Sequence, residues 1–146
     1  MSGGLVIRLR PHEKFLINGA VVENGDKRAK LRVKSRDANI LRLRDALHPN
    51  DATTPVKRIY YASQLVVTGD ADPHAALPDI MSGLNALYEV LPGDEIRQHI
   101  TEAIEHAQAY EFYHVMRMLK KVIPCEEQLL LIARAKEISQ ANTEAR

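Results

Sequence analysis

The sequence predicts an α+β protein, in which an antiparallel β-rich N-terminal part, residues 1–70, precedes a C-terminal helical bundle, residues 71–146. Two observations support this prediction. In the first part, apolar residues alternate with polar ones between Asn-Gly pairs, as in strands joined by tight hairpins. After a polar break at residues 68–73, apolar residues recur at helical spacing. With 45% hydrophobic residues, the 146-residue chain is expected to form one ordinary globular domain or two small ones that share a core.

The predicted strands of the first part carry basic residues on one face. In residues 5–10, Ile7 and Leu9 point to one side, and Arg8 and Arg10 to the other. Residues 14–17 and 20–23 are two short apolar strands, next to the hairpin signals Asn18-Gly19 and Asn24-Gly25. Residues 27–34 alternate strictly, which is typical of a half-buried antiparallel strand. Their basic face consists of Arg28, Lys30, Arg32 and Lys34.

The segment between these strands and the helical part is less clearly patterned. Residues 39–44 fit either a strand or the beginning of a short helix. Residues 56–67 are predicted as a helix, because Thr54-Pro55 resembles a cap followed by proline in the first turn. A strand is the alternative for this segment, since it is rich in Ile, Tyr and Val.

Prolines and capping residues divide the second part into helices. The first helix is expected to begin near residues 75–77, because Pro78 fits best in a first turn. Pro92-Gly93 ends it, and Asp94 is the expected cap of the next helix. The apolar residues from Tyr110 to Val122 form a third helix or a continuation of the second. Pro124 is expected to end that helix, and residues 126–127 to open a last one that frays over residues 140–146.

Bulk properties favour the cytoplasm. No apolar run approaches the ~20 residues that a membrane span needs, and the N-terminal residues lack the pattern of a signal peptide. The single cysteine, Cys125, cannot form an intrachain disulfide. We therefore expect a cytoplasmic protein without a membrane partner.

Charge is divided unequally along the chain. Residues 1–70 contain 13 Lys and Arg and seven Asp and Glu, whereas residues 71–146 contain seven and 12. Residues 27–44 alone hold eight basic residues and one acid. Alternate residues of a strand lie roughly 6.5–7 Å apart, close to the spacing of phosphates in an extended nucleic acid. The same pattern also fits a plain solvated sheet face, and the residues alone leave both interpretations open.

No catalytic or metal-binding pattern emerges. His99, Glu102 and His106 share a helix face, but no fourth ligand accompanies them. Cys125 follows a proline at the expected start of a helix, without an assigned base. Phosphate-binding glycine motifs are absent from the sequence, so we predict neither an enzyme nor a cofactor. The acidic helical half lacks basic patches, and its Met and aromatic residues indicate protein interaction or oligomerisation.

Three segments resemble the FlbT family of flagellum-biosynthesis repressors. They are residues 5–28 (LVIRLRPHEKFLINGAVVENGDKR), 38–49 (ANILRLRDALHP) and 64–73 (QLVVTGDADP). The resemblance implies a post-transcriptional regulator that binds the 5′ untranslated region of flagellin messenger RNA and promotes its degradation. It leaves repression or activation open. The alternative is a flagellar assembly factor or chaperone-like regulator that binds flagellin or another flagellar protein without touching RNA.

The β half is also similar in element order to the carbon storage regulator family. That similarity suggests that Arg42 or Arg44, with Arg8 and Arg10, reads RNA, and that strand exchange produces a homo-oligomer. The first half has few aromatic residues, so an RNA site there is expected to depend on arginine. The predicted RNA-binding residues are Arg8, Arg10, Arg28, Lys30, Arg32, Lys34, Arg42 and Arg44.

Overall fold

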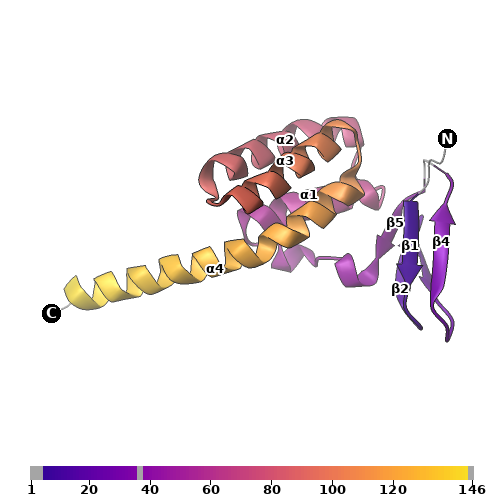
Figure 1. The fold of residues 1–146 in the computed structure, drawn as a ribbon, viewed down its shortest axis with the longest axis horizontal. Coiled ribbons are helices and arrows are strands. Elements are labelled where there is room, and N and C mark those ends of the chain that lie inside the picture. The colour runs from indigo at the N-terminus through magenta and orange to yellow at the C-terminus, as the bar shows by residue number, and fades with distance from the viewer. Residues whose placement is uncertain (1–4, 36–37, 145–146) are drawn as a thin grey trace.

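The computed structural model describes residues 5–35 and 38–144 and confirms the predicted α+β class. Five strands precede two short 3-10 helices and four α-helices within the described residues. The strands stand to one side of the helical bundle, as Figure 1 shows. Arg36 and Asp37, which belong to the basic stretch of the sequence, lie outside the described residues.

The strands form two small antiparallel sheets. Strand β1 (Leu5–Leu9) pairs with β4 (Ala29–Val33), and β2 (Lys14–Ile17) lies between β3 (Ala20–Glu23) and β5 (Ile40–Arg42). Side chains from both sheets share one apolar cluster, formed by Ile7, Leu9, Phe15 and Ile40. The predicted alternation in β1 is confirmed, because Ile7 and Leu9 are buried while Arg8 is exposed.

The connecting segment combines the two alternatives for residues 39–44. Strand β5 passes directly into the 3-10 helix η1 (Leu43–Asp45), and η2 (Pro49–Asp51) follows. Helix α1 (Pro55–Val67) confirms the helix prediction, and the backbone N–H of Lys57 donates to the Thr54 hydroxyl. The Gln64 side chain both accepts from and donates to the backbone of Leu47, so it fixes the connector on α1.

The main core lies between α1 and the three following helices: α2 (Pro73–Val90), α3 (Asp94–Gln108) and α4 (Phe112–Glu144). Its fully buried members include Val56, Leu84, Ile100, Val115 and Leu119. Leu41 of β5 belongs to the same cluster. The β part and the helical part are therefore joined through apolar packing as well as through the chain.

Two predicted helix starts are wrong. Helix α2 begins at Pro73 rather than near residues 75–77, because the Asp72 carboxylate accepts from the N–H of Ala75 and caps the helix there. Pro78 consequently lies inside α2, where it is exposed and provides no N–H for the carbonyl of residue 74. Asp94 is the first residue of α3 rather than its cap, and Gly93, with φ of 100°, occupies the cap position.

The predicted end at Pro124 is also wrong, because α4 continues through it to Glu144. Pro124 and Lys120, whose carbonyl loses its helical partner, are both exposed. On the opposite side, the buried Glu126 carboxylate accepts from the N–H of Val56 at 2.9 Å and anchors the helix after the proline. Cys125 therefore lies in the middle of a helix and not at its start.

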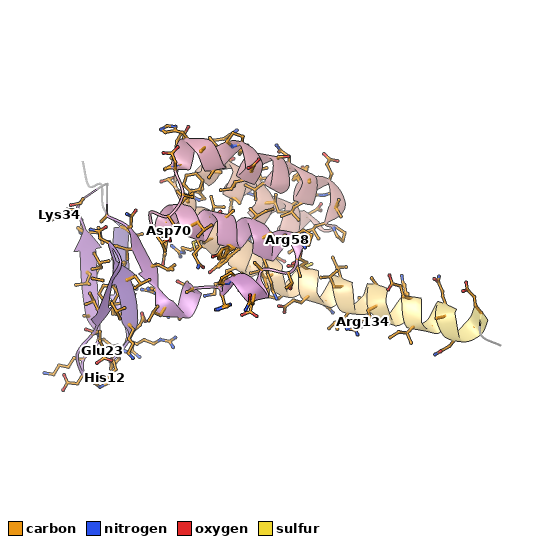
Figure 2. All side chains as sticks on the ribbon, turned by 180° about the vertical axis from the view of Figure 1, so that it is seen from behind. His12, Glu23, Lys34, Arg58, Asp70 and Arg134 are labelled. Carbon is orange, nitrogen blue, oxygen red and sulfur yellow. The ribbon has the colours of Figure 1, made fainter. Side chains whose placement is uncertain are left out.

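The last part of α4 projects beyond the bundle (Figures 1 and 2). Figure 2 places Arg134 on this projection and Lys34 at the end of the strands opposite His12 and Glu23. The predicted fraying over residues 140–146 does not appear in the described part, since α4 is helical to Glu144. Exposed apolar residues on the projection are Leu130, Leu131, Ile132 and Ile138.

Candidate nucleic-acid interface

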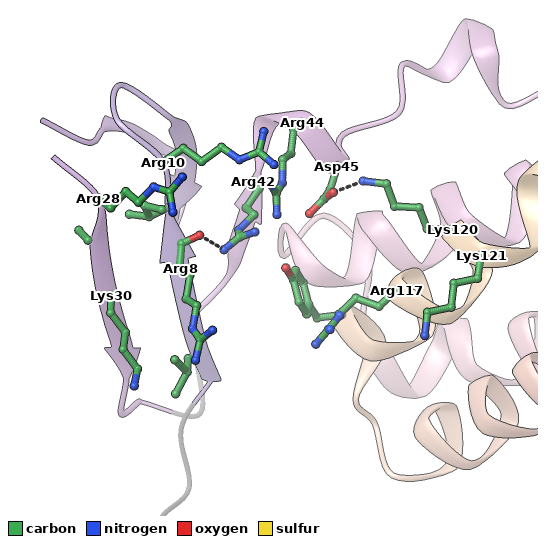
Figure 3. Close-up of a pocket in the computed structure, with 14 residues that line it drawn as sticks. Arg8, Arg10, Arg28, Lys30, Arg42, Arg44, Asp45, Arg117, Lys120 and Lys121 are labelled. Carbon is green, nitrogen blue, oxygen red and sulfur yellow. Dashed lines mark hydrogen bonds and ion pairs between the residues drawn. The ribbon is translucent and has the colours of Figure 1, made fainter. Parts of the chain in front are cut away.

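A groove of about 1070 Å³ separates the basic face of the β part from the first half of α4 (Figure 3). Among the described residues that line it, nine are Lys or Arg and one, Asp45, is acidic. The basic residues are Arg8, Arg10, Arg28, Lys30, Arg42, Arg44, Arg117, Lys120 and Lys121. Such a concentration of cations produces a positive potential that attracts polyanions.

Strand register explains the β wall of this groove. Arg8 of β1 lies opposite Lys30 of β4, and both side chains are exposed. Because successive side chains alternate between faces, the buried Ile7 and Leu9 direct Arg8 and Arg10 outward. Six of the eight predicted residues thus line one groove: Arg8, Arg10, Arg28, Lys30, Arg42 and Arg44.

Arg32 and Lys34 are not among the residues that line this groove. Arg32 is exposed in β4 opposite Val6, and Lys34 lines a second cavity at the other end of β1. The right-handed twist of a strand pair turns residues of one face progressively away from one another. Period-2 alternation in the sequence therefore predicts the face of each side chain but not which of them reach the same groove.

Arg42 has an internal role. It is buried, with 8% of its surface exposed, and its guanidinium donates to the carbonyl of Arg8. Its Nε also lies 3.8 Å from Glu13 Oε2. Arg42 thereby joins β5 of one sheet to β1 of the other, whereas Arg44, which is exposed, lies 3.8 Å from Glu13 Oε1.

Helix α4 supplies the opposite wall, which the sequence analysis missed. The expectation that the helical half lacks basic patches is wrong, because Arg117, Lys120 and Lys121 line the groove. Their spacing of three and four residues places all of them on one helix face. Figure 3 shows Arg117 reaching from α4 toward the strands and Lys120 directed at Asp45, with which it forms an ion pair.

Two tyrosines lie beside Asp45. The Tyr60 hydroxyl donates to the Asp45 carbonyl at 2.6 Å, and burial raises the pKa of Tyr60 far above its usual range. Burial, followed by the charge of Asp45, also raises the pKa of Tyr113. Both phenols therefore remain neutral at physiological pH, so neither adds negative charge to the groove.

The second cavity, of about 740 Å³, shares Val6, Tyr113 and Arg117 with the basic groove. Its walls come from the ends of β1 and β4, from α1, and from the turn between α3 and α4. Apolar residues make up just over half of its lining, and it has fewer charged residues than the basic groove, namely Lys34, Glu111 and Arg117. The two spaces therefore meet at the start of β1.

The histidines of α3 and the residues around them have other partners than a metal ion. Within residues 5–35 and 38–144, no three His, Cys, Asp or Glu side chains are grouped so that they could hold a metal ion. His99 Nε2 lies 3.9 Å from Glu95 Oε1. His106 Nδ1 forms a hydrogen bond of 3.1 Å with Glu111 Oε1, and the His106 ring stacks on that of His114. In the same described part of the chain, no helix is both long and apolar enough to cross a membrane.

Comparison with known proteins connects this architecture to a family. The family model described as "Flagellar protein FlbT" matches residues 5–130. The chain belongs to the FlbT family. The match includes every residue that lines the basic groove and ends before most of the projecting part of α4.

Relatives of this FlbT-family chain are named as repressors. "Flagellum biosynthesis repressor protein FlbT" of Caulobacter vibrioides is 30% identical over 126 residues, which cover 86% of this chain and 89% of the relative. "Probable flagellum biosynthesis repressor protein FlbT" of Rhodopseudomonas palustris is 34% identical over 127 residues, 86% of this chain and 97% of the relative. No solved structure matches the chain.

Proposed function

We propose that this protein is a non-enzymatic repressor of flagellum biosynthesis, and that it binds the 5′ untranslated region of flagellin messenger RNA and promotes its degradation. The names of its relatives support the regulatory part of this proposal. The nine basic residues around one groove support the RNA-binding part. This groove is the single observation that carries the RNA-binding part of the proposal.

The geometry favours an extended polyanion. Arg42 is buried and Lys120 is paired with Asp45, which leaves seven other cations that are exposed on two facing walls: Arg8, Arg10, Arg28, Lys30, Arg44, Arg117 and Lys121. Of these, Arg44 also lies 3.8 Å from Glu13. A single strand lying between the walls would place successive phosphates within reach of both. Phosphate contacts of this kind give affinity and position but do not by themselves select a sequence.

The groove also suggests how RNA binding acts on the protein. Its cations come from the β part and from α4, which lie on opposite sides of the groove. Binding would therefore hold the β part and the helical part together through a shared ligand. The projecting end of α4 would remain accessible to a protein that acts on the bound messenger.

Equilibrium titration of the full chain against a flagellin leader RNA and a shuffled RNA tests the proposal. A triple variant, Arg28→Ala, Lys30→Ala and Arg117→Ala, should weaken leader binding by more than tenfold at moderate salt, because it removes about three phosphate contacts. The matched control changes Arg58, Arg97 and Arg134, which are exposed but do not line the groove. Equal losses in both variants would refute the assignment of the groove, and failure of the unmodified protein to bind either RNA would refute RNA binding.

The projecting end of α4 favours a second candidate, a regulator that acts by binding protein. Leu131 has 68% of its surface exposed, and Leu130, Ile132 and Ile138 are also exposed on the same segment. A segment of this kind suits a flagellar protein partner or a second copy of the chain. If the changes Leu131→Asp and Ile138→Asp abolish repression and partner binding while RNA binding is undetectable, this candidate replaces the RNA proposal.

A further inference from the structure

The second cavity continues the basic groove but differs from it in chemistry. Val6, Tyr113 and Arg117 line both spaces, so a strand that leaves the groove at this end enters the cavity. Beyond these residues, the cavity is lined by one further cation, Lys34, one acid, Glu111, and a mixture of apolar and other polar residues. A space with few charges beside a phosphate-binding groove fits the uncharged part of a nucleotide, its base.

Tyr110, which also lines the cavity, has an unusual backbone conformation. It lies two residues after Gln108, the last residue of α3, with φ of 60°, in the left-handed region. Helices commonly place glycine or asparagine at this position, because a side chain there crowds the backbone. A bulky aromatic residue with positive φ is therefore an outlier, and such strain is concentrated at functional sites.

Neighbouring rings hold the Tyr110 side chain at the cavity without burying it. Its hydroxyl is 3.1 Å from His74 Nδ1, and the Phe112 ring meets it edge-on with centroids 6.2 Å apart. Tyr110 nevertheless has 44% of its surface exposed. The strained residue thus presents a fixed, accessible aromatic ring to the cavity.

We propose that the second cavity receives an unpaired base of the bound RNA, stacked on the ring of Tyr110, an inference that rests on the proposed function. Base–aromatic stacking is a common mode of single-strand recognition. Arg117 and Lys34 line the cavity and can contact the phosphates on either side of that base.

The polar lining favours a base with an exocyclic amino group. The Glu111 carboxylate lines the cavity and engages His106 through Oε1, which leaves Oε2 as an acceptor. An ionised carboxylate only accepts hydrogen bonds, so it can accept from the exocyclic amino group of cytosine. The one Watson–Crick donor of uracil, N3–H, lies between two carbonyl oxygens that repel the carboxylate. The cavity should therefore prefer cytosine to uracil.

Three probes of equal length separate base binding from phosphate binding: a 12-nucleotide oligocytidylate, an oligouridylate, and an abasic strand with the same phosphates. The unmodified protein should bind them in that order of decreasing affinity. Tyr110→Gly should weaken oligocytidylate binding roughly tenfold, the loss of one stacked base, and leave abasic binding unchanged. Tyr88→Ala is the control, because Tyr88 is similarly exposed, at 39%, and lines neither space.

Thermal melting separates recognition from structure. Glycine removes the ring contacts and also relieves the strained backbone, so Tyr110→Gly should melt close to the unmodified protein, and Tyr110→Asn should behave in the same way. Equal weakening for all three probes, or a much lower melting temperature in both variants, would assign Tyr110 a structural role and overturn the inference. If the unmodified protein binds the abasic and base-containing strands equally, the base pocket fails and the groove stands. If it binds none of them, the proposed function fails first.

Discussion

Arg42 and Arg44 should have opposite roles, although they stand two residues apart in the same basic stretch. Arg42 is buried and donates to the carbonyl of Arg8, and it lies 3.8 Å from the carboxylate of Glu13, itself 9% exposed. A hydrogen bond from a charged group contributes about 1.5–3 kcal/mol. Removing Arg42 also takes away one of the two positive charges beside the Glu13 carboxylate. Its negative charge is then balanced less well, by Arg44 at 3.8 Å.

The change Arg42→Ala should therefore lower the free energy of unfolding by about 3 kcal/mol. For a chain of this size, that loss lowers the melting temperature by roughly 6–12 °C. Arg44→Ala should lower the free energy of unfolding by less than about 1 kcal/mol, because Arg44 is exposed and its pair with Glu13 is partly solvated. RNA affinity should respond in the reverse order, provided that Arg42→Ala is measured below its melting transition.

Thermal unfolding and fluorescence anisotropy with a labelled leader RNA measure the two effects on the same samples. The folded fraction at the titration temperature is the necessary control for Arg42→Ala. Equal melting temperatures for the two variants would refute the reasoning, as would an Arg44→Ala variant that binds the leader as tightly as the unmodified protein. The first result would mean that the buried contacts of Arg42 contribute little, and the second that Arg44 does not meet the RNA.

Other predictions concern α4. Glu126→Ala should lower the free energy of unfolding in urea by about 2 kcal/mol, because the buried N–H of Val56 loses its acceptor; an unchanged unfolding midpoint would contradict this. Arg117→Ala and Lys121→Ala should each reduce the salt slope of RNA binding by about 0.7, and an unchanged slope would exclude the residue from the site. Burial, then the charge of the neighbouring His106, lowers the pKa of His114. The unfolded chain then binds more protons, so stability should fall as the pH drops below 6.5, and His114→Gln should reduce that fall in pH-dependent melting.

The β part could be predicted because its patterns are local. Alternation alone assigns Ile7 and Leu9 to the core and Arg8 to the surface, and the structure agrees. The pairing of β1 with β4 rather than with β2 joins residues far apart in the chain. Periodicity contains no information on partner choice, so the two-sheet arrangement could not be predicted from it.

The prolines of the helical part show where a local rule yields to tertiary structure. Pro124 removes one hydrogen bond from α4, which favours an end to the helix there. Packing of Val122 on the core and the bond from Val56 to Glu126 hold the helix on both sides of it. Val56 belongs to α1, and the sequence near Pro124 does not reveal this partner.

The basic wall that α4 contributes to the groove could not be found from the summed charge of the second half of the sequence. Residues 71–146 are acidic as a whole, yet Arg117, Lys120 and Lys121 occupy one helix face. A count over that helix face, in place of a count over half the chain, would have found this basic cluster. That it faces Arg8 and Lys30 follows only from the packing of α4 against α1, which no local pattern predicts.

The salt dependence of leader binding by the full chain tests the central claim most directly. Apart from Lys120, which is paired with Asp45, seven exposed cations line the groove. Each phosphate contact on a single strand contributes about −0.7, so the plot of log affinity against log salt should have a slope of about −5. A slope near zero, or no binding at low salt, would contradict the account and direct attention to a protein partner on the projecting end of α4.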